Sequence, residues 1–229
     1  KVRGKEARDV LFWLWVKRLG MVAIVVVMAM IYALSSAAFL GVQPTLSSPG
    51  VVIVDVSGGI GPGSLASGDR IVPIIEKACA SDNTQALILR INSPGGAPAD
   101  AERIGAAAER CKNWPSYREG AKRKVYAVID GLGASAGYLI AIHADHIVAN
   151  KTALVGSIGA VLSRLEFGEA MDRFGVRSME YATGPLKTTF SPYRADTKEQ
   201  QRYAQHLVDS ALEVFRGEVI KRRPMIDPN

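Results

Sequence analysis

The chain has 229 residues, of which 48% are hydrophobic and 22% are charged, a composition that is typical of globular proteins and excludes an intrinsically disordered one. The formal net charge is +6, but residues 1–18 alone hold six basic and two acidic side chains, so the rest of the chain is nearly neutral. A nearly neutral body gives little electrostatic support for nucleic-acid binding, and we expect no nucleic-acid partner.

The first fifty residues have the pattern of a membrane anchor followed by a linker. Residues 19–42 contain no charge and include "MVAIVVVMAMIYAL", and a helix of that length spans roughly 36 Å, enough for a bilayer core. Lys17 and Arg18 precede this stretch, so residues 1–18 are predicted to be a basic cytoplasmic segment. We therefore predict a transmembrane anchor over 19–42, a linker over 43–50 and the main domain over 51–229.

A cleaved signal peptide is the alternative for the same stretch. The segment "ALSSAAF" offers small residues for processing. The apolar stretch is long for the apolar core of a signal peptide, however, and this favours the anchor. Under both interpretations the main domain lies on the far side of the membrane.

Strands and helices alternate along the main domain. Short apolar runs rich in β-branched residues predict strands over 51–56, 86–91 and 125–130, and helical patterns occupy 68–81 and 97–114. Further strands are predicted over "HIVAN", "ALVGSIGAVLSRL" and "RSMEYA", with a helix over "FGEAMDRFG" and a long amphipathic helix over 196–223. This order is typical of βαβ units, so we predict an α/β fold with a parallel sheet and flanking helices.

The two cysteines, Cys79 and Cys111, lack the spacing of metal ligands. They fit either two buried thiols or one disulfide, and we interpret them as buried thiols.

Two glycine-rich turns directly follow predicted strands: "NSPGG" at 92–96 and "GLGASAG" at 131–137. The carboxyl ends of parallel strands meet at one edge of the sheet, where ligands bind in such folds, so both turns are expected there. Glycine at Gly95 and Gly96 exposes backbone N–H groups that suit an oxyanion hole. Ser135 stands at the start of a helix, where the helix dipole favours developing negative charge. It is either a nucleophile or an N-cap of that helix, the commoner role of a serine at such a position.

Histidine is the first candidate for the base that a serine nucleophile needs. His143 and His146 lie too close to Ser135 along one helix to fold back onto its hydroxyl, and their spacing lacks the accompanying Glu of a zinc site. His206 lies in the polar C-terminal helix, where we expect it to be solvated. No Asp–His pair stands out, which disfavours a Ser–His–Asp triad.

Lysine is the other candidate base. Lys187, in "TGPLKTTFSPYR", is the one charged residue between positions 181 and 193. An apolar environment favours the neutral amine, which can accept a proton. Ser157, in "VGSIGAV", lies in a third glycine-flanked turn and offers a hydroxyl that can hold the amine.

Five motifs now stand in a recognisable order: "RINSPGG", "GLGASAGYLIA", "ADHIVAN", "LVGSIGAV" and "TGPLKTTFSPYR". Over residues 51 to about 205 the chain resembles the signal peptide peptidase A family, the membrane-bound Ser–Lys serine peptidases that include the SohB type. The resemblance implies a crotonase-like α/β fold shared distantly with the Clp protease. It also implies Ser135 as nucleophile, Lys187 as general base and Ser157 as the residue that orients Lys187, with Gly96 and Gly95 as the oxyanion hole.

The resemblance implies a biological setting as well. Family members form dome-shaped rings in which serine and lysine can come from neighbouring subunits, and they degrade cleaved signal peptides in the bacterial envelope without ATP. We therefore expect a homo-oligomer at the bacterial inner membrane that cleaves hydrophobic peptides on the periplasmic side, without a metal or cofactor. The sequence departs from the family at "ASAG", where many members have "SGG", and at His146, a position that is often basic. Because the family usually continues beyond the last helix, we expect the domain over 51–229 to be incomplete at its C-terminal end.

Two other functions fit the same fold. A crotonase-like acyl-CoA enzyme would use the same oxyanion turns on a thioester, but it needs no serine matched to a lysine. A membrane-anchored scaffold that has lost its chemistry needs neither residue. The presence of both Ser135 and Lys187 favours the peptidase.

Overall fold

The computed structural model describes residues 15, 18–30, 49–114 and 122–226. It divides the chain into two units, Lys1–Ser47 and Ser48–Asn229. In the first unit residues 18–30 are helical, whereas residues 31–42 of the expected anchor, most of the basic segment and most of the linker lie outside the described residues. Within the described part, no helix is both long enough and apolar enough to cross a membrane.

The second unit is built on a parallel sheet, which confirms the predicted α/β class. Along the three longer strands, side chains largely alternate between buried and more exposed positions, and in the second strand Leu87, Leu89 and Ile91 are fully buried. In the described residues, four strands pair in chain order and a short fifth strand pairs with the end of the third: β1 (Gly50–Ser57), β2 (Thr84–Ser93), β3 (Lys124–Ala134), β4 (His146–Ala149) and β5 (Leu154–Gly156).

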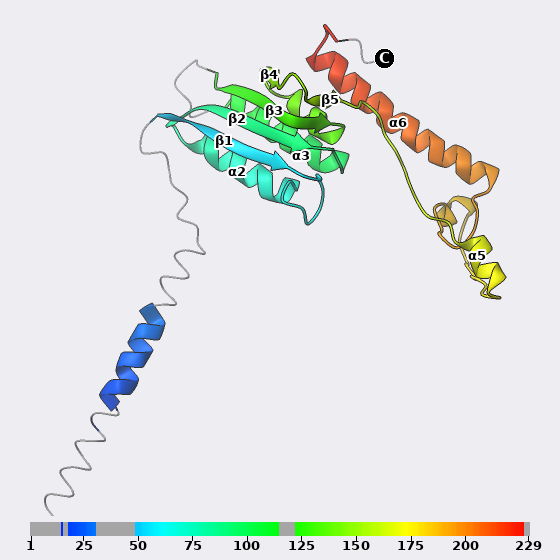
Figure 1. The fold of residues 1–229 in the computed structure, drawn as a ribbon, viewed down its shortest axis with the longest axis horizontal. Helices are drawn as coiled ribbons and strands as arrows, with labels where there is room; N and C mark the ends of the chain where they lie inside the picture. The colour runs from blue at the N-terminus through cyan, green and yellow to red at the C-terminus, as the bar shows by residue number, and fades with distance from the viewer. Residues whose placement is uncertain (1–14, 16–17, 31–48, 115–121, 227–229) are drawn as a thin grey trace, which may run out of the picture. The chain divides into compact units, whose positions relative to one another are not determined.

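The helices that connect these strands close the core on one side of the sheet. They are α2 (Gly68–Ala80), α3 (Pro98–Lys112) and α4 (Ala136–Ala141), and α2 and α3 lie side by side on the same face of the sheet (Figure 1). Strands that follow one another in order with right-handed crossovers place their helices on one face. Ile75 of α2 and Ile104 of α3 are buried against the sheet.

The interpretation of the cysteines as free thiols is wrong. Cys79 near the end of α2 and Cys111 near the end of α3 form a disulfide, with their Cα atoms 5.4 Å apart, and both residues are fully buried. The helices run side by side, so their ends meet although the cysteines are 32 residues apart. Beside the disulfide, buried Arg123 donates to the carbonyl oxygens of Cys79 (2.7 Å), Ser81 (3.1 Å) and Thr84 (2.8 Å).

Beyond β5 the chain leaves the sheet as an arm, which we define as residues 157–197. It contains the short helix α5 (Gly168–Arg173) and the 3₁₀ turn η1 (Pro185–Thr188). Figure 1 shows α5 standing away from the sheet and α6 (Lys198–Arg222) leading back to it. The strand predicted over 177–182 is absent, because no described strand lies beside this exposed segment to pair with it.

The last helix ties the arm to the sheet unit at its C-terminal end. Phe215 and Val219 of α6 are buried in the core, and Arg223 donates to the carbonyl oxygen of Ala144, which follows α4 (2.6 Å). At its other end α6 begins with a capping box in which Thr197 and Gln200 satisfy each other's backbone N–H groups.

Candidate active site

Ser135 lies where β3 ends and α4 begins, in a backbone conformation that few residues other than glycine adopt. Its φ is 50° and its ψ is −122°. Its N–H donates to the carbonyl oxygen of Gly156 (2.8 Å), and its own carbonyl accepts from the N–H of Leu139 (2.9 Å). These bonds hold the residue in a strained strand-to-helix turn of the kind that presents a nucleophile. Ser135 occupies the N-cap position of α4, but its hydroxyl makes no capping bond, so the side chain does not serve as a cap.

The turn at Gly95 and Gly96 packs directly against Ser135. The φ angles of these glycines are 104° and 145°. A Cβ at Gly95 would lie 2.7 Å from the Cβ of Ser135, and a Cβ at Gly96 would lie 2.0 Å from the carbonyl oxygen of Ile60. Only glycine therefore allows this approach. The structure brings both predicted oxyanion residues beside the serine.

The N–H groups of these two glycines differ in their availability. Gly95 donates its N–H to the Oγ of Ser93 (3.1 Å), and the Ser93 hydroxyl in turn donates to the carbonyl oxygen of Gly58 (2.6 Å). Among the described residues the N–H of Gly96 has no partner. Gly96 is thus the donor that is free to bind a ligand oxygen. Buried Ser93 supports the turn, a role that sequence reasoning missed although the residue belongs to "NSPGG".

Ser157 lies next to Ser135 at the end of the neighbouring strand. In the parallel pairing of β3 with β5, Ala134 is opposite Gly156, so the two serines follow directly at the strand ends. Ser157 also has a positive φ, 52°, and is exposed. The structure therefore brings Ser135, Ser157 and Gly96 together at one edge of the sheet.

These three residues line a groove of about 1200 Å³. Its walls come from α3, α4, α6 and the start of the arm. The residues that α4, α6 and the start of the arm contribute are mostly apolar, and the charged lining residues include Glu102, Glu109 and Arg222. The groove beside Ser135 is thus lined largely by apolar side chains.

Lys187 does not line this groove. It lies on η1 in the arm, its side chain is exposed, and its N–H donates to the carbonyl oxygen of Gly184 (3.2 Å). Within the described part of one chain, no contact joins Lys187 to Ser135 or Ser157. The structure thus brings together every predicted site residue except the lysine.

The histidines take three different environments. His143 is buried between α3 and α6, and its ring fits because α3 has Gly105 there, where a Cβ would lie 2.4 Å from the imidazole. Burial lowers the pKa of His143 to about 4, the positive charge of Arg222 acts in the same direction, and Glu109 opposes it. His146 stacks on Tyr126, and His206 is exposed on α6.

The electrostatic surroundings of His143 come from both helices that pack on it. Lys112 also lowers its pKa, and Glu218 on α6 also raises it. The Nδ1 atom lies 3.8 Å from the Oε2 of Glu109, too far for a hydrogen bond. His143 is therefore neutral at neutral pH and is held as a core residue.

Comparison with known proteins gives one family and several relatives. The profile of Peptidase family S49 matches residues 118–227. The chain is 34% identical over 126 residues to the Na(+)/H(+) antiporter NhaA of Brucella melitensis, a match that covers 55% of this chain and 16% of that protein. It is 30% identical over 139 residues to a putative signal peptide peptidase SppA of Enterococcus faecium, covering 61% of this chain and 38% of the relative. The chain thus spans well under half of the length of either relative.

Among solved structures, the chain is similar to a mutant of ClpP1 from Listeria monocytogenes. The match has 21% sequence identity and a TM-score of 0.29, and it covers 40% of this chain and 46% of that one.

Proposed function

Because this chain belongs to peptidase family S49, we propose that it is a serine endopeptidase in which Ser135 is the nucleophile and Lys187 the general base. Ser157 orients the lysine, and Gly96, with Gly95 beside it, forms the oxyanion hole. The observation that carries this proposal is the strained turn at Ser135, whose hydroxyl makes no capping bond and which lines the same groove as Gly96, a residue whose N–H has no partner among the described residues.

The proposed reaction follows from these positions. The Oγ of Ser135 attacks the scissile carbonyl while the neutral amine of Lys187 takes its proton. The oxyanion of the tetrahedral intermediate accepts a hydrogen bond from the N–H of Gly96. Lys187 then returns the proton to the leaving amine. In the second half of the reaction Lys187 takes a proton from water, the water oxygen attacks the acyl carbonyl, and Lys187 returns the proton to the departing Oγ of Ser135.

We further propose that the lysine comes from a second copy of the chain. In one chain Lys187 is exposed and makes no described contact with the groove. The arm that carries it also exposes large apolar side chains, each more than 70% accessible, which suits a surface that is covered by association. They are Val161, Leu165, Phe174, Met179 and Tyr181.

The proposed substrates are extended hydrophobic peptides such as cleaved signal peptides. The mostly apolar lining of the groove between α4 and α6 supports this class. We propose that the domain works on the periplasmic side of the bacterial inner membrane, attached by the anchor over 19–42. The Cys79–Cys111 disulfide supports this location, because disulfides persist in oxidising compartments and are rare in the cytosol.

The nucleophile is tested with a fluorophosphonate probe and a hydrophobic peptide substrate. We expect the probe to label Ser135 and hydrolysis to fall by up to roughly 10⁶-fold in Ser135→Ala. Ser210→Ala is the matched control, because Ser210 is exposed on α6 and, within the described part of the chain, its hydroxyl bonds only to that helix. An unlabelled protein that binds coenzyme A would favour the acyl-CoA enzyme, and activity in Ser135→Ala within tenfold of wild type would exclude the proposed nucleophile.

Subunit mixing tests the shared site. Ser135→Ala and Lys187→Ala are each expected to be inactive alone. If the pair forms between copies, mixed oligomers regain roughly a quarter of the wild-type rate, because a site is complete when each copy supplies its intact residue. No recovery after verified subunit exchange would place both residues in one chain.

A further inference from the structure

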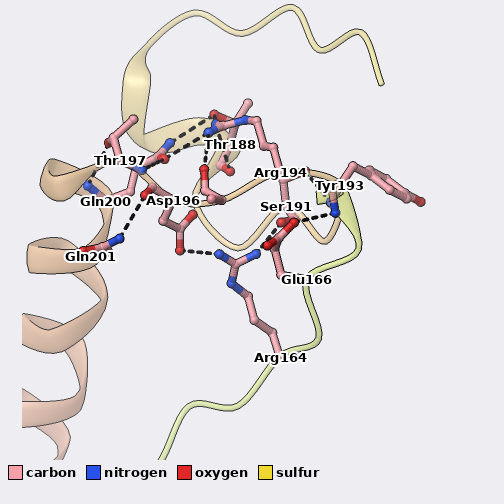
Figure 2. A network of polar contacts seen from close by, with 12 residues as sticks. Arg164, Glu166, Thr188, Ser191, Tyr193, Arg194, Asp196, Thr197, Gln200 and Gln201 are labelled. Atoms are coloured by element: carbon pink, nitrogen blue, oxygen red, sulfur yellow. Dashed lines mark hydrogen bonds and ion pairs between the residues drawn. The ribbon is translucent and has the colours of Figure 1, made fainter. Parts of the chain in front are cut away.

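The side chains of Gln200 and Arg194 form hydrogen bonds to the first and last residues of η1, the turn that contains Lys187. The Nε2 of Gln200 donates to the carbonyl oxygen of Pro185 (2.5 Å) and to the Oγ1 of Thr188 (3.2 Å). Arg194 donates to the carbonyl oxygen of Thr188 (3.3 Å) and to its Oγ1. Figure 2 shows Gln200 and Arg194 converging on Thr188. Gln200 and Arg194 therefore fix Pro185 and Thr188, which lie on either side of Lys187.

Gln200 has no freedom to rotate its amide. Its side chain is almost fully buried, with 1% of the residue exposed. Its Oε1 accepts from the N–H of Thr197 (3.0 Å) and from Arg194 (3.2 Å), while its Nε2 makes the two bonds to η1. Every hydrogen-bonding position of the amide is thus occupied. Since Gln200 is also part of the capping box, its orientation is set by the start of α6.

Arg194 is itself held in place by an ion pair with Glu180. Glu180 accepts from its Nε (3.2 Å) and also from the hydroxyl of Ser191, and these two donors lower the pKa of the Glu180 carboxyl so that it stays ionised. Arg164 forms an ion pair with Asp196 (2.7 Å) across the same loop (Figure 2). The loop between η1 and α6 is therefore bonded at several points.

Lys187 differs from the residues around it in that its side chain makes no described polar contact. The turn around it is bonded on both sides, yet the ammonium group has no described hydrogen bond or ion pair. A buried, fully bonded amide that supports an exposed and unpartnered lysine is an arrangement suited to aiming that lysine at a target outside the arm.

We propose that Gln200, together with Arg194, is a positioning residue that fixes the turn Pro185–Thr188 and thereby aims Lys187 at the nucleophilic serine. The inference rests on the proposed function of Lys187 as the base. Gln200 does not touch the reacting atoms and acts only through the lysine.

The first test compares Gln200→Ala with Gln205→Ala in the full chain, using a hydrophobic peptide substrate. Gln205 is the matched control, because it lies on the same helix, is exposed and, among the described residues, uses its side chain to bond only Asp209 one turn away. A misplacement of about 1 Å costs roughly 10²-fold in rate, so kcat should fall by that factor in Gln200→Ala while KM changes less than threefold. Gln205→Ala should match wild type in both.

The second test separates positioning from a general loss of structure. Residual hydrolysis of an activated ester is measured in Lys187→Ala and in Lys187→Ala with Gln200→Ala. If Gln200 acts only through the lysine, the second substitution changes the residual rate less than twofold. A further fall of tenfold or more would show a structural role and overturn the inference.

A third variant covers the case in which Gln200→Ala does not fold. Thr188→Val keeps the shape of the side chain but removes the acceptor that Gln200 and Arg194 share, and it should lower kcat by at least tenfold with KM little changed. If Lys187→Ala is inactive but Gln200→Ala or Thr188→Val keeps kcat within twofold of wild type, the positioning role is refuted and the Ser–Lys pair stands. If Lys187→Ala keeps the wild-type kcat, the proposed base is wrong and the positioning role falls with it.

Discussion

Removing the disulfide between α2 and α3 should destabilise the domain by an amount that follows from the loop it closes. The cysteines are 32 residues apart in the sequence. For a loop of this size, the loss of unfolded-chain entropy corresponds to about 3.5–4 kcal/mol at 25 °C. The unit Ser48–Asn229 has an unfolding entropy near 0.4 kcal/mol/K at typical values per residue, so Tm should fall by about 10 °C in Cys79→Ala with Cys111→Ala.

The assay is thermal and urea unfolding of the full chain with and without dithiothreitol. Reductant should lower the Tm of the wild type by a similar amount and leave the double variant unchanged. The urea m-value of the double variant should rise, because its unfolded state is more expanded. A free thiol in the denatured, unreduced wild type, or a loss of stability below about 1 kcal/mol, would refute the reasoning.

Three further substitutions, one of them with a matched control, test the core and the site. Because His143 binds a proton near pH 6.5 in the unfolded state and only near pH 4 in the folded state, the free energy of unfolding should fall as the pH drops between these values. By pH 5 this loss is about 2 kcal/mol. Urea unfolding at pH 8 and pH 5 should show a fall that is smaller by this amount in His143→Gln than in the wild type. Gly96→Ala should lower the free energy of unfolding by more than about 3 kcal/mol and abolish hydrolysis, since the added Cβ would collide with the carbonyl oxygen of Ile60. The control is Gly217→Ala, on α6, where the added Cβ has no neighbour within 4 Å; it should be neutral or stabilising by up to about 1 kcal/mol. Arg123→Met should cost about 3–5 kcal/mol in urea unfolding, because two buried carbonyl groups and one partly buried carbonyl group lose their donor. A cost below about 1 kcal/mol would contradict this account.

Part of the site could be predicted because its residues lie in turns that follow strands. The apolar runs before "NSPGG" and "GLGASAG" form β2 and β3, and neighbouring parallel strands bring their carboxyl ends to one edge. The proximity of Ser135 to Gly95 follows from that topology. The strain at Ser135 was not evident in the sequence, because its φ angle depends on the bond from its N–H to Gly156.

Sequence reasoning failed where long segments pack against one another. It predicted a strand over 177–182, but β-branching and alternation produce a strand only if another strand lies beside it, and none does within the described residues. It also missed the disulfide, because the approach of Cys79 to Cys111 depends on the way α2 lies along α3.

The sequence by itself determined the order of strands and helices up to β5, the α/β class and the glycine turns at the sheet edge. These features depend on side chains that are a few residues apart, and the spacing of such side chains can be read directly from the sequence. Only the tertiary structure decided that Ser157 lies beside Ser135, that Gln200 holds the turn of Lys187, and that Lys187 stays outside the groove of its own chain. The distances between residues that are far apart in the sequence depend on how the segments between them fold and pack. A local sequence pattern therefore does not predict these distances.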